Sequence, residues 1–380
     1  MMDDEMKKMW SEMDGTPYDS MAGILRPRIH SDVPSFIDVP VAYEASDLEG
    51  LDVGFIGLPF EGWIHPAPMQ WPTSGARPAD PDVLEGRSGA WDAPDYIRKC
   101  AVHYSICTSG GFCPEVAGDF RICDHITMAD YRNVEFDPWD VEDFSKKAIE
   151  KVADIVKGGA IPLIFGGDHS ISYPPVRAIS DNSDGEIGII LFDGHYDNMY
   201  GGDAPFPEKN AVTRLNSGNQ FYKIFDTCKA HPKNMVVIGV KGGAANMMSW
   251  HEMAVKLGYT IFTNEDVEDL GIKEVMRQAI AVATKDTDKV YCSLDVDACD
   301  PISFPAQKYP DPFGIPARDI RTALRILSRE TNLCGFDMVC LGPAYDNRND
   351  GGQTAAKLYI EILKGLAYRK AYGITTHGPE

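Results

Sequence analysis

The chain has 380 residues, of which 44% are hydrophobic and 24% charged, a balance that suits a soluble globular protein with a large core. Its formal net charge is −21 and its pI is near 4.8. An acidic field of this size repels nucleic acid and anionic membranes, so it argues against both as partners and favours a small cationic ligand.

The cysteines and the N-terminal segment both point to the cytoplasm. Nine cysteines are scattered without a CxxC pair, which is typical of reduced thiols. The opening segment MMDDEMKKMW begins with acidic residues and does not have the basic and apolar regions of a secretory signal. No apolar stretch approaches the roughly 20 residues that a membrane-spanning helix needs.

After an irregular arm over residues 1–50, short apolar runs alternate with helical patterns. Apolar runs without alternation are typical of buried strands in a parallel sheet. The clearest helix is expected over residues 140–159, where apolar residues share one face, and a second over residues 354–370. The predicted strands span residues 53–58, 160–165, 187–192, 235–240, 259–262, 290–295 and 334–341.

Strands that alternate with helices predict an α/β fold with a central parallel sheet covered on both faces. Such sheets bind ligands beyond the carboxyl ends of their strands, so chemistry is to be sought there. Residues 61–92 are rich in Pro, Gly and Trp and too long for an ordinary connection, which predicts a functional loop near the site.

Three strand ends carry acidic and imidazole groups, in the segments IFGGDHS, LFDGHYD and SLDVDACDP. In extended backbone, residues two apart project to the same side, so Asp193, His195 and Asp197 can converge, as can Asp295 and Asp297. Any one segment alone is more often a cap or a surface turn, whereas the three together favour a metal site. The candidate ligands are His169, Asp193, His195, Asp197, Asp295 and Asp297.

Four carboxylates crowded beside two imidazoles would repel one another without a positive counter-charge. Divalent cations supply that charge, and the six ligands are too many for one tetrahedral zinc but suit two ions that share bridging carboxylates. Oxygen-rich ligation with two imidazoles favours Mn²⁺, with Ni²⁺ or Fe²⁺ also accepted.

The motifs GGDHS, DGHYD and DVDACDP resemble those of the ureohydrolase family of arginases, agmatinases and guanidinobutyrases. The likeness continues in GLPFE, SGAWDAPDYIRK and AYDNRNDGGQTAAKL. It implies a single-domain, three-layer α/β/α fold over residues 51–380, following the N-terminal arm over residues 1–50. It also implies a homo-oligomer, a trimer or hexamer, with a mixed oligomer that includes a ureohydrolase paralogue as the alternative.

The resemblance further implies a role for each ligand. His169, Asp193, Asp197 and Asp295 would bind the first ion, and Asp193, His195, Asp295 and Asp297 the second. A hydroxide held between the ions would attack a guanidinium carbon, with Asp197 as a catalytic residue, and release urea or a substituted urea plus an amine.

The chain departs from the family pattern where agmatinases carry a proton-shuttle histidine. The corresponding segment reads LNSGNQFYKIF, and no histidine lies between His195 and His231. His65, in the Trp-rich loop, is the candidate substitute as catalytic residue. Ser217 and Asn219 from this segment are expected to contact the substrate.

A second departure concerns substrate binding, because the family's guanidinium-binding glutamate aligns with Cys340. A small, weakly polar side chain there favours a bulkier or N-alkylated guanidine. The segment ISFPAQKYPDPFGIPARD does not contain the family's PGT, and Gly194 replaces an alanine, which also indicates a diverged pocket. Two branches of the family, the nickel-dependent guanidine hydrolases and metformin hydrolase, look similar to this chain in its long arm and loop and in the replaced acidic contact.

The leading hypothesis is a two-metal hydrolase that cleaves a C–N bond of a guanidino or biguanide compound. The alternative is a non-catalytic subunit that stabilises an active paralogue, since the shuttle histidine and the glutamate are both replaced. A one-zinc deacetylase on a related fold is the weakest hypothesis, because such sites do not have the second set of ligands.

Overall fold

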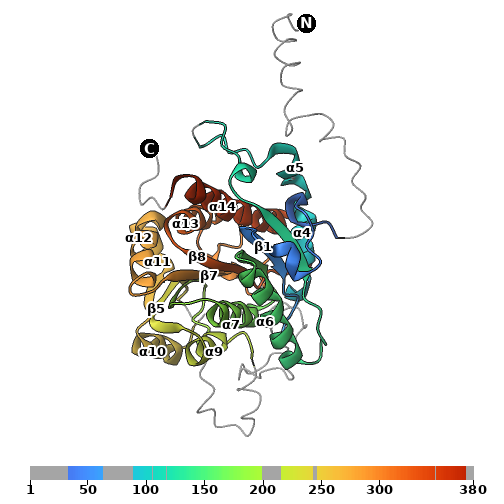
Figure 1. Ribbon diagram of the computed structural model, residues 1–380. Helices are drawn as coiled ribbons and strands as arrows, with labels where there is room; N and C mark the ends of the chain where they lie inside the picture. The colour runs from blue at the N-terminus through green and yellow to red at the C-terminus, as the bar shows by residue number, and fades with distance from the viewer. Residues whose placement is uncertain are drawn as a thin grey trace, which may run out of the picture.

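The computed structural model describes residues 33–62, 89–104, 106–116, 118–198, 215–242, 246–346 and 348–373. Within these residues one sheet of eight parallel strands has the order β2-β1-β3-β8-β7-β4-β5-β6. Figure 1 shows this sheet between two layers of helices, which confirms the predicted three-layer α/β fold. The strands are β1 Val53–Gly57, β2 Met128–Asn133, β3 Ile161–Phe165, β4 Ile187–Phe192, β5 Ala230–Val240, β6 Thr260–Thr263, β7 Lys289–Asp295 and β8 Leu333–Val339.

All seven predicted apolar runs form strands, because each is covered on both faces. In β4, Ile189 and Leu191 pack with side chains of the helices on one face, while Ile190 and Phe192 belong to the larger cluster on the other face. Every residue of β4 is buried. A strand in this position has no polar face, which explains why its sequence does not alternate.

Helices α6, α7, α9 and α10 cover one face of the sheet, and α4, α12, α13 and α14 cover the other (Figure 1). Ile155 of α6 packs so closely on Gly54 that a Cβ there would lie 2.7 Å from its Cγ2. On the opposite face, Tyr359 of α14 meets Phe165 edge to face with ring centroids 4.7 Å apart. The helices are α4 Ala93–Cys100, α5 Ile106–Ser109, α6 Val141–Lys157, α7 Tyr173–Asn182, α9 Gln220–Thr227, α10 Met248–Leu257, α11 Asn264–Leu270, α12 Ile272–Ala283, α13 Ala317–Glu330 and α14 Asp350–Tyr372.

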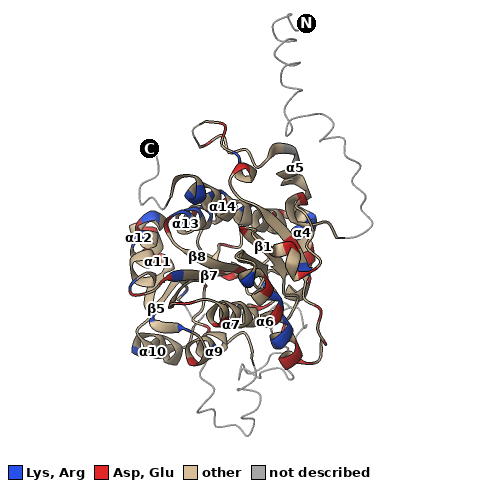
Figure 2. Ribbon diagram, viewed as in Figure 1, with Lys and Arg blue, Asp and Glu red and all other residues tan. Residues whose placement is uncertain are grey.

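Both predicted helices are confirmed, as α6 and α14. Asp140 caps α6, since its side chain accepts hydrogen bonds from the backbone N–H groups of Glu142 and Asp143. Figure 2 shows acidic and basic residues interspersed along the outer face of α6, which keeps that face solvated. Among the described helices, none combines the length and the apolar character that crossing a membrane requires.

The described part of the N-terminal arm packs on the sheet. Phe36 lies in a short 3₁₀ turn, Phe36–Asp38, and its ring is 4.8 Å from that of Phe55 and 4.9 Å from that of Phe165. Val41 forms a β-bridge with Asp130. Residues 33–50 therefore contribute to the core, while the domain boundary at residue 50 stays a prediction.

Candidate active site

The predicted ligands lie at the carboxyl ends of β3, β4 and β7, in the turns that follow those strands. β7 pairs with β4 in parallel, with Leu294 opposite Phe192, so the acids after the two strands are neighbours. β8 lies between β3 and β7, and His169, in the turn after β3, reaches across its end. The sheet order therefore brings together groups that are far apart in the chain.

The first group of ligand atoms surrounds the imidazole of His169. Its Nδ1 atom lies 2.8 Å from Oδ2 of Asp197, 3.2 Å from Oδ2 of Asp193 and 3.3 Å from Oδ2 of Asp295. The four ligand atoms all lie within 4.8 Å of one another. Among the described residues, His169 Nδ1 and Asp193 Oδ2 are buried without a hydrogen-bond partner. Converging, unpartnered donor atoms of this kind fit a divalent cation.

A second group adjoins the first and shares Asp193 with it. His195 Nδ1 lies 3.1 Å from Oδ2 of Asp297 and 3.4 Å from Oδ1 of Asp193. Asp193 thus directs one carboxylate oxygen to each group, as a bridging ligand does. The structure gathers Asp295 only into the first group, so its part in the second stays a prediction.

The crowded carboxylates raise the pKa values of several groups in the cluster. Burial, together with repulsion from Asp297, raises the pKa of Asp295 to about 8. Burial and the neighbouring carboxylates also raise the pKa of Asp193. Burial by itself would lower the pKa of His169, yet three carboxylates raise it well above its ordinary value. The cluster therefore holds protons that a bound cation would displace.

The backbone around His169 depends on two glycines. A Cβ on Gly167 would lie 1.8 Å from the carbonyl oxygen of Phe60, and one on Gly166 would lie 2.5 Å from that of Met338. Neither glycine has a positive φ, so their role is close approach to neighbouring backbones.

A buried hydrogen-bond network behind His169 was not predicted. His169 Nε2 lies 3.1 Å from Oγ of Ser293, which donates to Oδ1 of Asp337 at 2.5 Å. Tyr291 donates to Oδ2 of the same carboxylate at 2.5 Å. All four side chains are inaccessible to solvent. The network holds Nδ1 toward the carboxylates, and its sequence signal is the acid inside the apolar run CGFDMVCL.

The segment after the expected shuttle position also reaches the cluster. Ser217 and Asn219 lie in the turn before α9, where Asn219 Oδ1 accepts a hydrogen bond from the backbone of Asn216. The next residue, Gln220, is fully buried and donates to Oδ2 of Asp197 at 3.1 Å. Gln220 was not predicted, and the substrate roles of Ser217 and Asn219 stay predictions.

Cys340 lies directly after β8 and next to the cluster. It has a φ of 63°, a left-handed conformation that is strained for a side chain of this kind, and Asp197 shares this strain with a φ of 41°. Burial and the charge of Asp295 raise the pKa of the Cys340 thiol well above its ordinary value, so the thiol is neutral. His65 lies outside the described residues.

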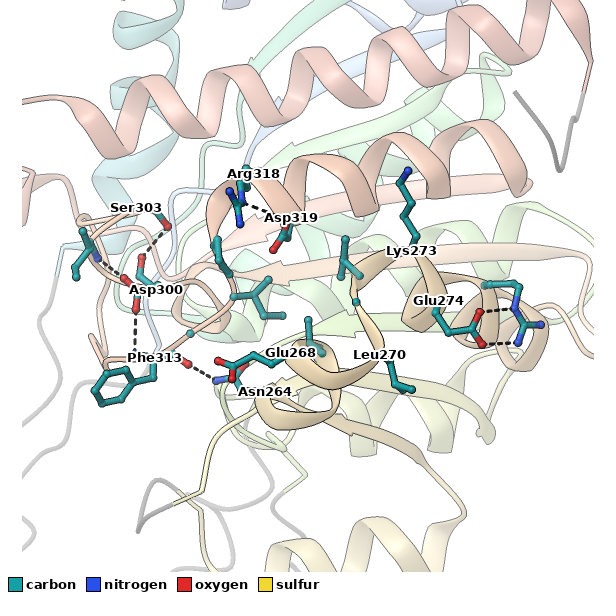
Figure 3. Close-up of a pocket in the computed structure, with 18 residues that line it drawn as sticks. Asn264, Glu268, Leu270, Lys273, Glu274, Asp300, Ser303, Phe313, Arg318 and Asp319 are labelled. Atoms are coloured by element: carbon teal, nitrogen blue, oxygen red, sulfur yellow. Dashed lines mark hydrogen bonds and ion pairs between the residues drawn. The ribbon is translucent and has the colours of Figure 1, made fainter. Parts of the chain in front are cut away.

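A separate surface pocket of about 1090 Å³ lies between α11, α12 and the segment before α13 (Figure 3). Its lining includes Asn264, Asp300 and Phe313 but none of the six predicted ligands. Asp300 accepts hydrogen bonds from the backbone of Ile302 and Phe313, which fixes the loop on this side. The pocket and the cluster are therefore distinct features.

The fold and the cluster together define a parallel α/β protein with an acid and imidazole centre able to bind metal at its strand ends. The family model described as "Arginase family" matches residues 76–364, so the chain belongs to the arginase family. It is a hydrolase that acts on carbon–nitrogen bonds of amidine-like groups, as the family assignment and its named relatives indicate.

Relatives within the family have different names. Formimidoylglutamase from Halalkalibacterium halodurans is 26% identical over 73% of this chain and 82% of its own length. Agmatinase from Chromobacterium violaceum is 25% identical over 86% of this chain and 87% of its own length. The crystal structure of Trypanosoma cruzi formiminoglutamase with Mn²⁺ has a TM-score of 0.69 at 18% identity, covering 88% of this chain and 99% of that one. The solved structure shows the same fold, and because the relatives carry different names the substrate is left open.

Proposed function

We propose that this chain is a two-metal hydrolase that cleaves a C–N bond of a guanidino or biguanide compound. The products would be urea, or a substituted urea, and an amine. The observation that carries the proposal is the convergence of four carboxylates and two imidazoles in two adjoining groups at one edge of the sheet. The candidate substrates are guanidine, agmatine, 4-guanidinobutyrate and N-alkylated compounds such as metformin.

The donor set fits two divalent cations, and we propose Mn²⁺ or Ni²⁺. One imidazole per ion with oxygen ligands otherwise is a set that both ions accept. When bound, the pair supplies water activated for attack near neutral pH and polarises the substrate. His169, Asp193, Asp197 and Asp295 would hold one ion, and Asp193, His195 and Asp297, joined by Asp295, would hold the other.

Substrate would approach the cluster from the side of Asp197 and His195. Their side chains are 21% and 24% exposed, whereas those of Asp193 and His169 are inaccessible. Oδ2 of Asp197 faces His169 and accepts from Gln220, which leaves Oδ1 to hold a proton. Asp197 is therefore the proposed carrier of a proton from the attacking water to the leaving amine.

The proposal is tested by metal content and by activity. The purified chain, loaded separately with Mn²⁺ and Ni²⁺, is assayed for urea release from guanidine, agmatine, 4-guanidinobutyrate, arginine and dimethylbiguanide. Asp193→Asn should lose both metal and activity, while Asp181→Asn, at an exposed acid on α7, should lose neither. Fewer than about one ion per chain in excess metal would contradict a two-metal site.

A non-catalytic subunit of a mixed oligomer is the second candidate function. The specific observation in its favour is that Cys340, buried beside Asp295, offers no charge to a guanidinium group. In that case, activity would require co-expression with a ureohydrolase paralogue. Urea release by this chain alone would exclude the second candidate.

We also propose a cytoplasmic location and a trimeric or hexameric assembly. The scattered cysteines support the location, and all those that the structure describes are free thiols. Light scattering on the purified chain tests the assembly, and a monomer at micromolar concentration would contradict it.

A further inference from the structure

The loop over residues 300–315 is closed at its base next to the pocket of Figure 3. The backbone N–H of Asp300 donates to the carbonyl of Ile315 at 2.9 Å, and that of Ile315 donates to the carbonyl of Ala298 at 2.9 Å. Figure 3 shows the carboxylate of Asp300 joined to the backbone on both sides of the loop. A closed base of this kind gives the loop a fixed position above the sheet.

The middle of the same loop is fixed against the segment that carries Cys340. The backbone N–H of Lys308 donates to the carbonyl of Cys340 at 2.9 Å, and that of Gly342 donates to the carbonyl of Ala306 at 3.0 Å. The Lys308 ammonium lies 2.7 Å from Oε1 of Glu61, and both side chains are almost completely buried. The positive charge of Lys308 is thus balanced by the Glu61 carboxylate, and its side chain is enclosed within the protein.

Tyr309 follows Lys308 and is only partly buried. Its ring meets the imidazole of His195 edge to face, with centroids 6.1 Å apart and an interplanar angle of 76°. Burial, opposed by the nearby Lys308 cation, raises the pKa of the Tyr309 phenol to about 12, so the phenol is neutral at neutral pH. An uncharged aromatic ring therefore borders the exposed side of the cluster.

We propose that Tyr309, together with Cys340, forms the wall that selects a small guanidine or amidine carrying an uncharged, apolar N-substituent. This inference rests on the proposed function and names the substrate class of the same site. An aromatic ring attracts an alkylated cation and also packs against its methyl groups. The buried Cys340 adds only a small, weakly polar side chain to this wall, which suits an apolar substituent.

Two lysines among the described residues, Lys241 and Lys308, lie near the cluster, and both are buried. Lys241 Nζ donates to the carbonyl of Asp311 at 2.5 Å, and Lys308 pairs with Glu61. Neither ammonium is free to bind a substrate carboxylate.

The test compares kcat/KM for guanidine, N,N-dimethylguanidine and 4-guanidinobutyrate in the wild type, Tyr309→Phe and Tyr309→Ala. The wild type should favour dimethylguanidine, and Tyr309→Phe should keep that preference because the ring is retained. Tyr309→Ala should reduce the preference about tenfold, mainly through KM. Phe313→Ala, at an 82% exposed ring on the same loop, is the matched control and should leave it unchanged.

A second measurement separates this inference from the proposed function. Calorimetry on the Mn²⁺-loaded protein compares the binding of N,N-dimethylurea and urea, which requires no turnover. Tighter binding of dimethylurea that Tyr309→Ala removes would support the Tyr309 wall even if no guanidine is hydrolysed. Equal binding of the two ureas by the wild type, an unchanged preference in Tyr309→Ala, or a wild-type preference for 4-guanidinobutyrate would overturn it.

Discussion

The sheet buries carboxylates in two places that differ in where the positive charge comes from. On β2, Asp130 accepts hydrogen bonds from Nε and Nη2 of Arg98, each at 2.8 Å. It also accepts hydrogen bonds from the backbone N–H groups of Phe36 and Arg132. Burial would raise the pKa of Asp130, but Arg98 more than offsets this and holds the pKa below its ordinary value. Here the chain supplies its own counter-charge.

At the ends of β4 and β7 no arginine fills that role among the described residues. Asp193 Oδ2 and Asp297 Oδ2 are buried there without a hydrogen-bond partner, and the pKa of Asp295 is raised to about 8. Burial alone therefore does not identify a functional acid. The informative feature is a buried carboxylate whose counter-charge must come from outside the chain.

Removing one acid from each region should have opposite effects on the metal-free protein. Asp295→Asn removes one of several mutually repelling groups, so the metal-free Tm should stay the same or rise. Metal affinity should nevertheless fall by more than about 100-fold, because even partners behind the ligands account for 10–100-fold. Calorimetric titration with Mn²⁺ measures this, and an unchanged affinity would contradict the assigned site.

Asp130→Asn should destabilise the protein by about 3 kcal/mol, since it removes the buried carboxylate partner of Arg98 and leaves that cation only a longer ion pair of 3.6 Å with the more exposed Asp95. Metal stoichiometry should stay unchanged in the folded variant. Denaturant unfolding followed by circular dichroism measures the loss. If Asp130→Asn unfolded no more easily than the wild type, the distinction between the two regions would not hold.

Asp337→Asn tests whether the network behind His169 orients the imidazole toward the cluster. Metal affinity should fall by about 10–100-fold, because the Ser293 hydroxyl no longer has a carboxylate to donate to. Ser293→Ala should produce a similar loss, and Thr354→Ala, an exposed hydroxyl on α14, serves as the control. An affinity equal to that of the wild type in both variants would exclude an orienting role.

The stability of the metal-free protein should fall as pH rises from about 4 to about 8. In that window the folded state keeps a proton on Asp295, whose pKa is about 8, whereas the unfolded chain has already lost it. The pKa of His169 is also raised, so its contribution to stability is likewise lost as pH rises above the ordinary histidine pKa. Because a bound Mn²⁺ ion would displace these protons, the increase in Tm on adding Mn²⁺ should grow with pH. Thermal melts with and without metal measure it, and a constant increase would contradict the assignment.

The smallest effect is expected at exposed charge pairs. Asp181→Asn breaks the pair with Arg177 on α7, where solvent screens the interaction, and should leave metal content and Tm close to those of the wild type. This variant therefore separates a general effect of removing negative charge from the specific effect at the cluster.

The sequence identified the strands that are apolar throughout but not β2. Its sequence MADYRN carries Asp130 and Arg132, and the pairing that makes the aspartate tolerable in a buried strand comes from α4. For the same reason Ser293, Asp337 and Gln220 could not be assigned beforehand. Each is a common residue type whose importance depends on a partner far away in the chain.

Local sequence patterns were enough to predict the parallel α/β class and the three ligand-bearing segments, because continuous apolar runs and the two-residue spacing of ligands can be recognised without the fold. How those segments meet depends on the three-dimensional packing. Because β8 lies between β3 and β7, His169 must extend across the end of β8 to meet Asp193. Packing between distant segments also determines which buried acids are paired with a cation of the chain. Tyr309 comes to lie beside His195 for the same reason, since contacts between distant segments are fixed by the fold and not by neighbouring residues.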